Sequence, residues 1–367
     1  MRIAILGAGA WGTALGIALA PRHAITLWCR DPQQGGQLTA ARVNTRYLPG
    51  IVIPGTVQIT TDAEAVLQSC ELVVVAVPTA ALRETVRRVA SRKRALDVVW
   101  LCKGFESGSA KFPHQVAGEE LGERFRFGAL SGPSFADEVA RGLPAAVTLA
   151  SHDAEFAAAA ARELHTGRLR VYSSDDLAGV ETGGAVKNVI AIAAGICDGL
   201  KLGSSARAAL ITRGLAETTR LGMRLGGRLE TFMGLAGAGD LILTATSDLS
   251  RNRRVGLGLA SGRHLPDILG DLGHVAEGVF SAREVHRLAQ ELDVDMPITR
   301  AVCRVLDGHV AARDAIHDGQ LPAVARRRQP ADRRRVLPAV LHERRLGEGD
   351  ALRGVQLSGD ARQQPDS

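Results

Sequence analysis

The first half of the chain alternates short, continuous apolar runs with segments of helical periodicity. The runs lie at Arg2–Leu6, Ile25–Trp28, Leu72–Val77, Val98–Cys102, Phe127–Leu130 and Ala145–Ala150. A short apolar run without alternation is typical of a strand that is buried on both faces. Strands separated by helices predict an α/β architecture, with a parallel sheet covered on both sides. We expect shorter polar segments, such as 31–44, to connect or decorate this sheet.

The pattern changes near residue 175. From Asp176 onward we find no convincing strand pattern, and apolar residues recur at helical spacing. The predicted helices are Val180–Asp198, Ser205–Leu225, Arg251–Ser261, Ser281–Leu292 and Thr299–Asp307. We therefore expect an α/β domain over residues 1–175 and an all-α domain over residues 176–320. Ligands should bind where the two domains meet.

The basic charge of the chain lies mainly in its last residues. The 367 residues carry a formal charge of +6, and residues 321–367 hold ten Arg against six acidic residues, a net of +4. Aromatic residues are only 4% of the chain and do not alternate with a basic stripe. We therefore expect no nucleic-acid partner for the main fold. Residues 321–367 have lost the helical periodicity, and we expect a flexible, Arg-rich tail.

The cysteines and the longest apolar run indicate where the protein acts. The five cysteines form no Cys-x-x-Cys pair, so we expect buried free thiols, no disulfide and no metal site. The longest apolar run, Val189–Cys197, is too short to span a bilayer, so we expect no membrane insertion. The chain also begins directly with a predicted strand instead of a signal peptide. We expect a cytoplasmic protein.

A glycine-rich turn follows the first predicted strand. Gly7-Ala-Gly-Ala-Trp-Gly12 fits the pattern G-x-G-x-x-G and opens a helix. Gly7 permits the tight turn, Gly9 lets the backbone approach a pyrophosphate, and Gly12 allows close packing of helix and strand. The helix N-terminus adds amide donors for the phosphates. We therefore predict a dinucleotide site here.

The end of the second strand leaves the choice of dinucleotide open. Many such strands end in an acidic residue that binds the adenosine ribose, and here the sequence is Cys29-Arg30-Asp31. Arg30 suits a 2′-phosphate or a stacked adenine, whereas Asp31 suits a ribose. Two solvated loop charges are the third possibility.

One lysine lies in an almost wholly apolar helix. In Gly183–Cys197 the only strongly polar side chains are Lys187 and Asn188, although the chain has only five lysines. A helix that is apolar all round is buried, and burial lowers the pKa of a lysine towards values useful in acid–base catalysis. A snorkelling lysine or a structural ion pair are the alternatives. We predict a catalytic role for Lys187.

Three arginines stand in the first turn of a predicted helix that Ser250 caps. Arg251, Arg253 and Arg254 oppose the helix dipole there, and an anionic ligand would remove the conflict. We predict a phosphate site that includes Arg251. The alternative is that the arginines pair with acidic neighbours such as Asp248, and we expect this for one or two of the three. Two further turns, at Lys103-Gly104 and at residues 131–136, follow strands at the sheet edge where ligands bind.

Together these motifs resemble a known family. They are Gly7-Ala-Gly-Ala-Trp-Gly12, Tyr47-Leu-Pro-Gly50, Cys102-Lys-Gly104, Ser131-Gly-Pro-Ser-Phe-Ala136, Val186-Lys-Asn-Val189, Ala238-Gly-Asp-Leu241 and Ser250-Arg-Asn-Arg253. In this order, over about residues 1–320, the chain resembles the bacterial NAD(P)-dependent glycerol-3-phosphate dehydrogenases. The resemblance implies a Rossmann-type doubly wound domain, followed by an all-α domain similar to the C-terminal helical domain of 6-phosphogluconate dehydrogenase. It also implies a homodimer that reversibly reduces dihydroxyacetone phosphate to sn-glycerol 3-phosphate with NAD(P)H, for glycerophospholipid synthesis.

The resemblance also implies roles for individual residues. Lys187 matches the proton-transfer residue. The matched substrate-contacting residues are Lys103, Gly132, Ser134, Lys187, Asn188, Asp240, Ser250, Arg251 and Asn252. The matched cofactor-contacting residues are Gly7, Gly9, Ala10, Trp11, Gly12, Arg30, Lys103, Ala136, Arg251, Val275 and Glu277.

The chain departs from the family pattern at three places. Gly35-Gly36 is glycine-rich for a helix that relatives usually form, and Ser204-Ser205 replaces an acidic or Asn residue. Residues 321–367 match no family segment; a natural extension and a shifted reading frame both remain open.

Two other functions would fit part of this pattern. A β-hydroxyacid-type dehydrogenase that acts on a carboxylate would share the two-domain fold, but the phosphate-suited helix start at Ser250 argues against it. A nucleotide sensor without catalysis would have no need of the buried pair Lys187 and Asn188.

Overall fold

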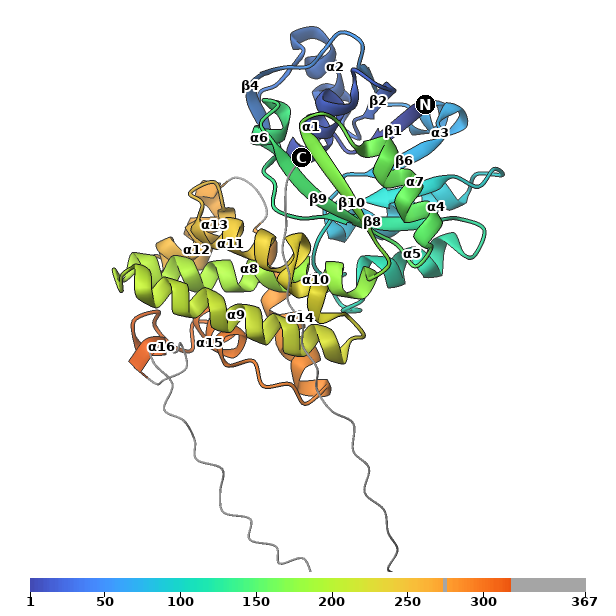
Figure 1. Ribbon diagram of the computed structural model, residues 1–367. Helices are drawn as coiled ribbons and strands as arrows, with labels where there is room; N and C mark the ends of the chain where they lie inside the picture. The colour runs from blue at the N-terminus through green and yellow to red at the C-terminus, as the bar shows by residue number, and fades with distance from the viewer. Residues whose placement is uncertain (273–275, 318–367) are drawn as a thin grey trace, which may run out of the picture. The chain divides into compact units, whose positions relative to one another are not determined.

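An eight-stranded sheet occupies the first half of the chain (Figure 1). A computed structural model describes residues 1–272 and 276–317, so the predicted tail lies outside the described residues. The strands are β1 (Arg2–Leu6), β2 (Ala24–Trp28), β5 (Gln58–Thr60), β6 (Leu72–Val75), β7 (Asp97–Trp100), β8 (Phe127–Ser131), β9 (Ala145–Ala150) and β10 (Leu169–Ser174). Their order across the sheet is β10-β9-β8-β7-β6-β1-β2-β5.

The predicted α/β architecture is confirmed, with one exception at an edge of the sheet. From β5 to β8 all neighbouring strands are parallel, and the order reverses direction at β1, as in a doubly wound nucleotide-binding fold. The strand β9 pairs antiparallel with β8, and β10 then pairs parallel with β9. The expectation of an all-parallel sheet is therefore wrong at this edge.

Helices cover both faces of the sheet. Along β1, Ile3 and Ile5 pack into one cluster while Ala4 and Leu6 pack into another, because successive strand residues point to opposite faces. The first cluster includes residues of α1 (Ala10–Leu19) and α7 (Ala154–Leu164). The second includes residues of α3 (Ala63–Ser69), α4 (Leu82–Ala90) and α5 (Pro113–Leu121). Burial on both sides explains why these strands are continuously apolar.

The segment after β2 contains a helix that the glycine pair did not favour. The helix α2 (Pro32–Ala41) begins with Asp31 as its cap, because the Asp31 carboxylate accepts from the Gln33 N–H at 2.9 Å. Gly35 is required by packing, since a Cβ there would lie 2.6 Å from a Thr61 methyl carbon. The rest of this region forms a two-stranded sheet, β3 (Val43–Asn44) with β4 (Leu48–Val52). Two short helices complete this half, η1 (Thr79–Ala81) and α6 (Ala136–Ala140).

The described residues beyond 174 form helices and no strand, as the periodicity predicts. The helices are α8 (Leu177–Gly199), α9 (Ser204–Arg224), α10 (Leu229–Met233), the π-helical turn η2 (Leu235–Gly239), α11 (Asp240–Thr246), α12 (Arg251–Ala260), α13 (Leu265–Leu272), α14 (Glu277–Glu291), α15 (Pro297–Leu306) and α16 (Asp314–His317). By length and composition α8 would suit a membrane span. Its apolar window is instead entirely buried within the protein, which is typical of a central core helix.

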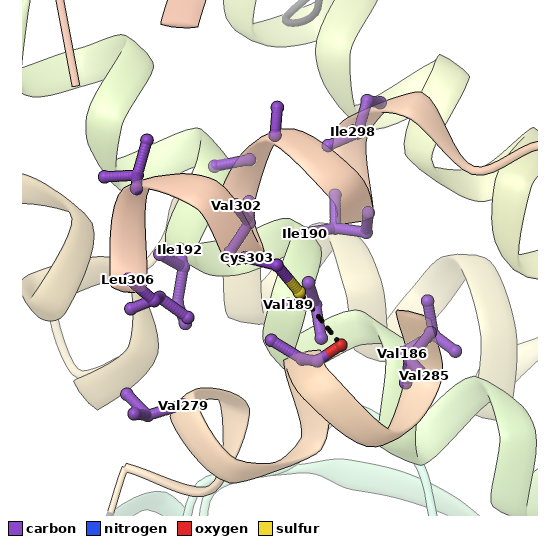
Figure 2. Packing of buried hydrophobic residues seen from close by; sticks show 14 of the residues in the cluster. Val186, Val189, Ile190, Ile192, Val279, Val285, Ile298, Val302, Cys303 and Leu306 are labelled. Atoms are coloured by element: carbon purple, nitrogen blue, oxygen red, sulfur yellow. Dashed lines mark hydrogen bonds between the residues drawn. The ribbon is translucent and has the colours of Figure 1, made fainter. Parts of the chain in front are cut away.

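The core of the helical half is built around α8. Figure 2 shows α14 and α15 packing on it with small and branched side chains. The labelled residues are Val186, Val189, Ile190, Ile192, Val279, Val285, Ile298, Val302, Cys303 and Leu306. The thiol of Cys303 donates to the carbonyl oxygen of Ala282 at 3.2 Å, which joins α15 to α14. All five cysteines are free and buried.

Two glycines bring α12 into backbone contact with α8. A Cβ at Gly195 would lie 2.0 Å from the Arg253 carbonyl oxygen, and a Cβ at Gly256 would lie 2.1 Å from the Ile192 carbonyl oxygen. A helical glycine costs about 1 kcal/mol relative to alanine. The close crossing that it permits sets the start of α12 beside the polar residues of α8.

Candidate active site

The glycine-rich turn between β1 and α1 has the geometry of a phosphate-binding loop. Gly7 has φ +121°, and a Cβ at Gly12 would lie 1.9 Å from the Gly7 carbonyl oxygen. Both glycines are therefore required by the fold itself. A Cβ at Gly9 would meet nothing within 4 Å, and no side chain caps α1. The space at Gly9 and the free amides of the first turn, at Ala10 and Trp11, fit a pyrophosphate.

Two amides that the sequence analysis missed hold this turn. The side chains of Asn44 and Gln34 both donate to the Ala8 carbonyl oxygen at 3.0 Å, and Asn44 also donates to the hydroxyl of Thr13 at 2.8 Å. They belong to β3 and α2, which cover the turn from the side of β2. No motif marks them, because polar residues in a connecting segment are common.

The carboxyl end of β2 places its two charged residues differently. The carboxylate of Asp31 caps α2, whereas Arg30 is exposed. Asp31 also lines a cavity of about 210 Å³ between α2 and the start of the β3–β4 sheet. The other lining residues are Gln33, Gln34, Gln37, Leu38, Val43, Asn44, Thr45 and Arg46. The cavity lies where the adenosine end of a dinucleotide would extend from the glycine turn.

Two lysines share one buried aspartate at the centre of the site. Lys187 comes from α8, Lys103 follows β7, and Asp240 is the first residue of α11. The ammonium of Lys103 donates to Oδ2 of Asp240 at 2.6 Å, and that of Lys187 donates to Oδ1. Asp240 is 1% exposed and Lys187 8%. The prediction that Lys187 is buried is therefore confirmed. Along the chain, Lys103 lies 137 residues before Asp240 and Lys187 lies 53 residues before it.

Burial and the neighbouring charges change the acidity of this cluster. Burial lowers the pKa of Lys187 well below its ordinary value; the carboxylate of Asp240 opposes this, and the second ammonium of Lys103 reinforces it. Burial alone would raise the pKa of Asp240, but the two ammonium groups outweigh it and hold that pKa below its ordinary value. A lysine that loses its proton this readily, beside an ionised carboxylate, is suited to proton transfer.

A π-helical turn places Asp240. The turn η2 leads directly into α11, and a Cβ at Gly237 would lie 2.1 Å from the Phe232 carbonyl oxygen. The hydroxyl of Thr244 donates to the Asp240 carbonyl oxygen at 2.6 Å and lies 3.5 Å from its Oδ1. Such π-turns occur frequently at functional sites.

The turn after β8 lies against this helix start. Gly132 has φ +145°, and a Cβ there would lie 2.9 Å from the Val147 Cα. Ser134 donates to the Gly132 carbonyl oxygen at 3.1 Å, and α6 begins at Ala136. A Cβ at Gly239 would lie 3.3 Å from Pro133, so this turn touches the end of η2 beside Asp240.

The amides of Asn188 and Asn252 bond to each other. Asn252 donates to Oδ1 of Asn188 at 3.0 Å and accepts from the N–H of Gly278 at 3.0 Å. Both asparagines are buried. Asn252 therefore links α12 to α8 and α14, and its carboxamide holds these three helices together beside Lys187.

Two arginines at the start of α12 have different environments: Arg253 forms ion pairs, and Arg251 is exposed. Ser250 accepts from the Arg253 N–H at 3.2 Å as the helix cap. Arg253 pairs with Asp198 at 2.7 Å and with Asp248 at 2.6 Å, so it is structural. Arg251 is exposed, and no ion pair involves it within the described residues.

Glu277 lies close to the same positive charges. Burial raises the pKa of Glu277 above its ordinary value, while Arg251, Lys103 and Lys187 oppose the rise. Val275, the other residue of this segment that the resemblance assigns to the cofactor, lies outside the described residues. Across residues 1–272 and 276–317, no group of three or more His, Cys, Asp or Glu side chains is arranged to hold a metal ion.

The sequence analysis missed one further buried charge near the lysines. Glu181 lies on α8, and its carboxylate accepts from the indole N–H of Trp100 at 2.9 Å. An acidic residue six positions before Lys187 in an apolar helix was the available signal.

Comparisons with known proteins agree with this arrangement. Residues 2–157 match the family model "NAD-dependent glycerol-3-phosphate dehydrogenase N-terminus", and residues 176–317 match that for the C-terminus. The chain is 59% identical over 320 residues to "Glycerol-3-phosphate dehydrogenase [NAD(P)+]" of Nitrosospira multiformis, covering 86% of this chain and 96% of the relative. The protein of the same name from Dechloromonas aromatica is 59% identical over 316 residues, with the same coverage.

A solved structure gives the same result, and the hydroxyacid alternative is not favoured. The crystal structure of glycerol-3-phosphate dehydrogenase from Coxiella burnetii superimposes with a TM-score of 0.82 at 43% identity. The match covers 86% of this chain and 98% of that one. The chain belongs to the family of NAD-dependent glycerol-3-phosphate dehydrogenases.

Proposed function

We propose that the protein catalyses the reversible reduction of dihydroxyacetone phosphate to sn-glycerol 3-phosphate with NADH or NADPH. The observation that carries this proposal is the buried Lys187, whose ammonium is held by Asp240 beside Lys103. The product is the backbone of glycerophospholipids, and we place the enzyme in the cytoplasm as a homodimer.

The residues of the glycine turn fit the cofactor. The free amides after Gly9 would hold the pyrophosphate, with Gly7 and Gly12 shaping the turn and Ala10 and Trp11 beside it. Arg30 would face the adenosine end. On the nicotinamide side, the candidates are Lys103, Ala136, Arg251 and Glu277. Val275 remains a cofactor residue by resemblance alone, because it lies outside the described residues. Bound NAD(P)H supplies the hydride that reduces the ketone.

The chain's own residues would bind the substrate and move the proton. Arg251 at the start of α12 would bind the phosphate, with Gly132, Ser134, Ser250 and the buried asparagines Asn188 and Asn252 around the substrate. Lys187 would donate its proton to the oxygen of the forming alkoxide, because burial makes its ammonium a stronger acid than an exposed lysine. Asp240 would keep the ammonium of Lys187 aimed, and Lys103 would add positive charge beside the substrate oxygens.

The division into residues 1–175 and 176–320 is part of the same proposal. The first segment would hold the dinucleotide, and the second would supply Lys187, Asp240 and the phosphate site. Lys103 and Asp240 come from the two segments and bond at 2.6 Å. This contact supports a site made by both.

The test is the oxidation of NADH and of NADPH, followed by absorbance, with dihydroxyacetone phosphate as the substrate. We expect turnover with at least one of them, and an about 10²- to 10⁴-fold lower kcat in Lys187→Ala with NAD(P)H binding retained. Lys93→Ala is the matched control, because Lys93 is exposed. Faster turnover of a phosphate-free hydroxy acid, or near-normal kcat in Lys187→Ala, would contradict the assignment.

A further inference from the structure

A buried carboxylate ties together the two elements that carry the lysines. Glu181 of α8 has a side chain that is 4% exposed. Its carboxylate accepts from the Trp100 indole N–H at 2.9 Å and from the His114 backbone N–H at 3.1 Å, and the Nδ1 of His114 is also bonded to it. Three donors on one buried carboxylate are enough to fix its position.

The partners of Glu181 lie close along the chain to the residues of the lysine cluster. Trp100 ends β7, three residues before Lys103, and Glu181 precedes Lys187 by six residues on α8. His114 is in the first turn of α5, so the carboxylate also satisfies one backbone amide at the positive end of that helix. The bond from Glu181 to Trp100 therefore joins the end of the strand that precedes Lys103 to the helix that bears Lys187.

Leu177 and Val180 of α8 lie in the same apolar cluster as Trp100, and a small cavity lies beside this contact. It has room for about one water molecule (about 10 Å³) and is lined by Lys103, Ser131, Glu181 and Gly184 among others. The hydroxyl of Ser131 is buried there and has no hydrogen-bond partner among the described residues. A Cβ at Gly184 would lie 3.4 Å from the Lys103 side chain, so the stem of Lys103 passes this helix at a glycine. Beside this space, the hydrogen bonds of Glu181 add a directional constraint to the apolar packing.

We infer that Glu181 is a positioning residue for the reaction: its bonds to Trp100 and His114 hold α8 against β7 and α5, so that Lys187 and Lys103 meet the two oxygens of Asp240. This inference rests on the proposed function. Without Glu181, the Trp100 N–H is buried and unpaired, and α8 shifts to relieve it. A displacement of about 1 Å at reacting groups costs about 100-fold in rate.

The test compares Glu181→Ala and Glu181→Gln with Glu217→Ala. Glu217 is the matched control, because it is also a buried carboxylate (1% exposed) that caps a helix, accepting from the Ile298 N–H at 2.7 Å, but within the helical core. We expect Glu181→Ala to lower kcat for dihydroxyacetone phosphate by about 10- to 100-fold, with the dissociation constant of NAD(P)H unchanged. Glu217→Ala should lower the melting temperature but leave kcat of the folded enzyme unchanged.

The pH profile separates positioning from a merely structural role. A loosened cluster admits water to Lys187, which moves its pKa back towards the ordinary value. The limb of the kcat profile that reports this lysine should therefore move to higher pH in Glu181→Ala. The amide of Glu181→Gln still accepts from Trp100 but not from all three donors, so it should restore part of kcat.

The outcomes distinguish the two proposals. A folded Glu181→Ala with wild-type kcat and an unmoved limb overturns the positioning role alone. If Glu181→Ala does not fold, Glu181→Gln decides, and a kcat equal to that of the wild type overturns the inference. An inactive wild-type enzyme overturns the proposed function, and this inference with it.

Discussion

Replacing Asp240 by asparagine tests the electrostatic reasoning directly. Each carboxylate oxygen accepts from one lysine, at 2.6 Å in the case of Lys103. An asparagine keeps the shape but offers a single acceptor oxygen, and its NH₂ group faces an ammonium. The variant therefore removes the only carboxylate that bonds these two lysines in the described residues.

The size of the effect follows from the separation of the charges. A unit charge within about 4 Å contributes about 4 kcal/mol at an effective dielectric constant of about 20. At about 1.4 kcal/mol per unit, this corresponds to a shift of about three pKa units. Because Asp240 is what opposes the effect of burial, its loss lowers the pKa of Lys187 further, and Lys103 still repels the ammonium. Lys187 is then neutral at neutral pH and has no proton to donate.

The assay is kcat for dihydroxyacetone phosphate reduction between pH 5 and 9. We expect Asp240→Asn to be at least about 100-fold slower than wild type at neutral pH, with activity rising as the pH falls. Asp307→Asn, which breaks a surface pair with Arg283, is the control and should match wild type. A profile for Asp240→Asn with its limb unmoved, or moved to higher pH, would refute the role given to this carboxylate.

Three further predictions concern binding and stability. Arg251→Ala should raise the KM for dihydroxyacetone phosphate about tenfold or more, because a charged hydrogen bond contributes about 1.5–3 kcal/mol. The KM for NAD(P)H should change less. An unchanged KM for dihydroxyacetone phosphate would exclude Arg251 from the phosphate site. Burial raises the pKa of Glu217 to about 7 from an ordinary 4.5. The folded chain thus holds this proton more tightly than the unfolded chain, so its contribution to stability is complete below pH 4.5 and declines by about 3 kcal/mol as the pH rises to 7. Urea denaturation at pH 5 and 8 should show Glu217→Gln to be less pH-dependent than wild type, and equal slopes would count against the shift. Gly256→Ala should lower the free energy of unfolding by about 1–3 kcal/mol, because the added Cβ would lie 2.1 Å from the Ile192 carbonyl oxygen. At Gly270 an added Cβ meets no atom within 4 Å, so Gly270→Ala should raise the free energy of unfolding by up to about 1 kcal/mol. Melting temperatures compare this pair, and a stable Gly256→Ala would contradict the close crossing.

The sequence predicts the elements whose signal is local. The strands β1, β2 and β6 appear as continuous apolar runs because helices cover both of their faces. The strand β10 was missed because its exposed and buried residues alternate at an edge, LRVYSS, so no apolar run marks it. The antiparallel direction of β9 depends on how the chain returns to the sheet, which no local pattern records. The helix α2 forms despite its two glycines because Asp31 caps it and Gly35 fits against Thr61.

For the site, too, the sequence predicts only those features that depend on residues near one another along the chain. Burial of Lys187 follows from the apolar helix around it, and the division among the arginines of α12 follows from the helix dipole. The sharing of Asp240 by two lysines does not follow from any spacing, because these residues meet only after the sheet and the helices pack. Glu181 went unnoticed for the same reason: its partners Trp100 and His114 lie about 70 to 80 residues earlier in the chain.

The charges of the site explain why a depressed lysine pKa suits this chemistry. Three cations, Lys103, Lys187 and Arg251, face two acids, Asp240 and Glu277, and burial raises the pKa of Glu277. Positive charge is therefore in excess around the buried Lys187, where an anionic substrate would relieve it. In the proposed complex, a phosphate bound near Arg251 would favour the ammonium form of Lys187, so the proton would stay on the lysine until an alkoxide forms beside it. The same lysine, once neutral, is a base poised to take the proton back from an alcohol, which is what a reversible dehydrogenase requires.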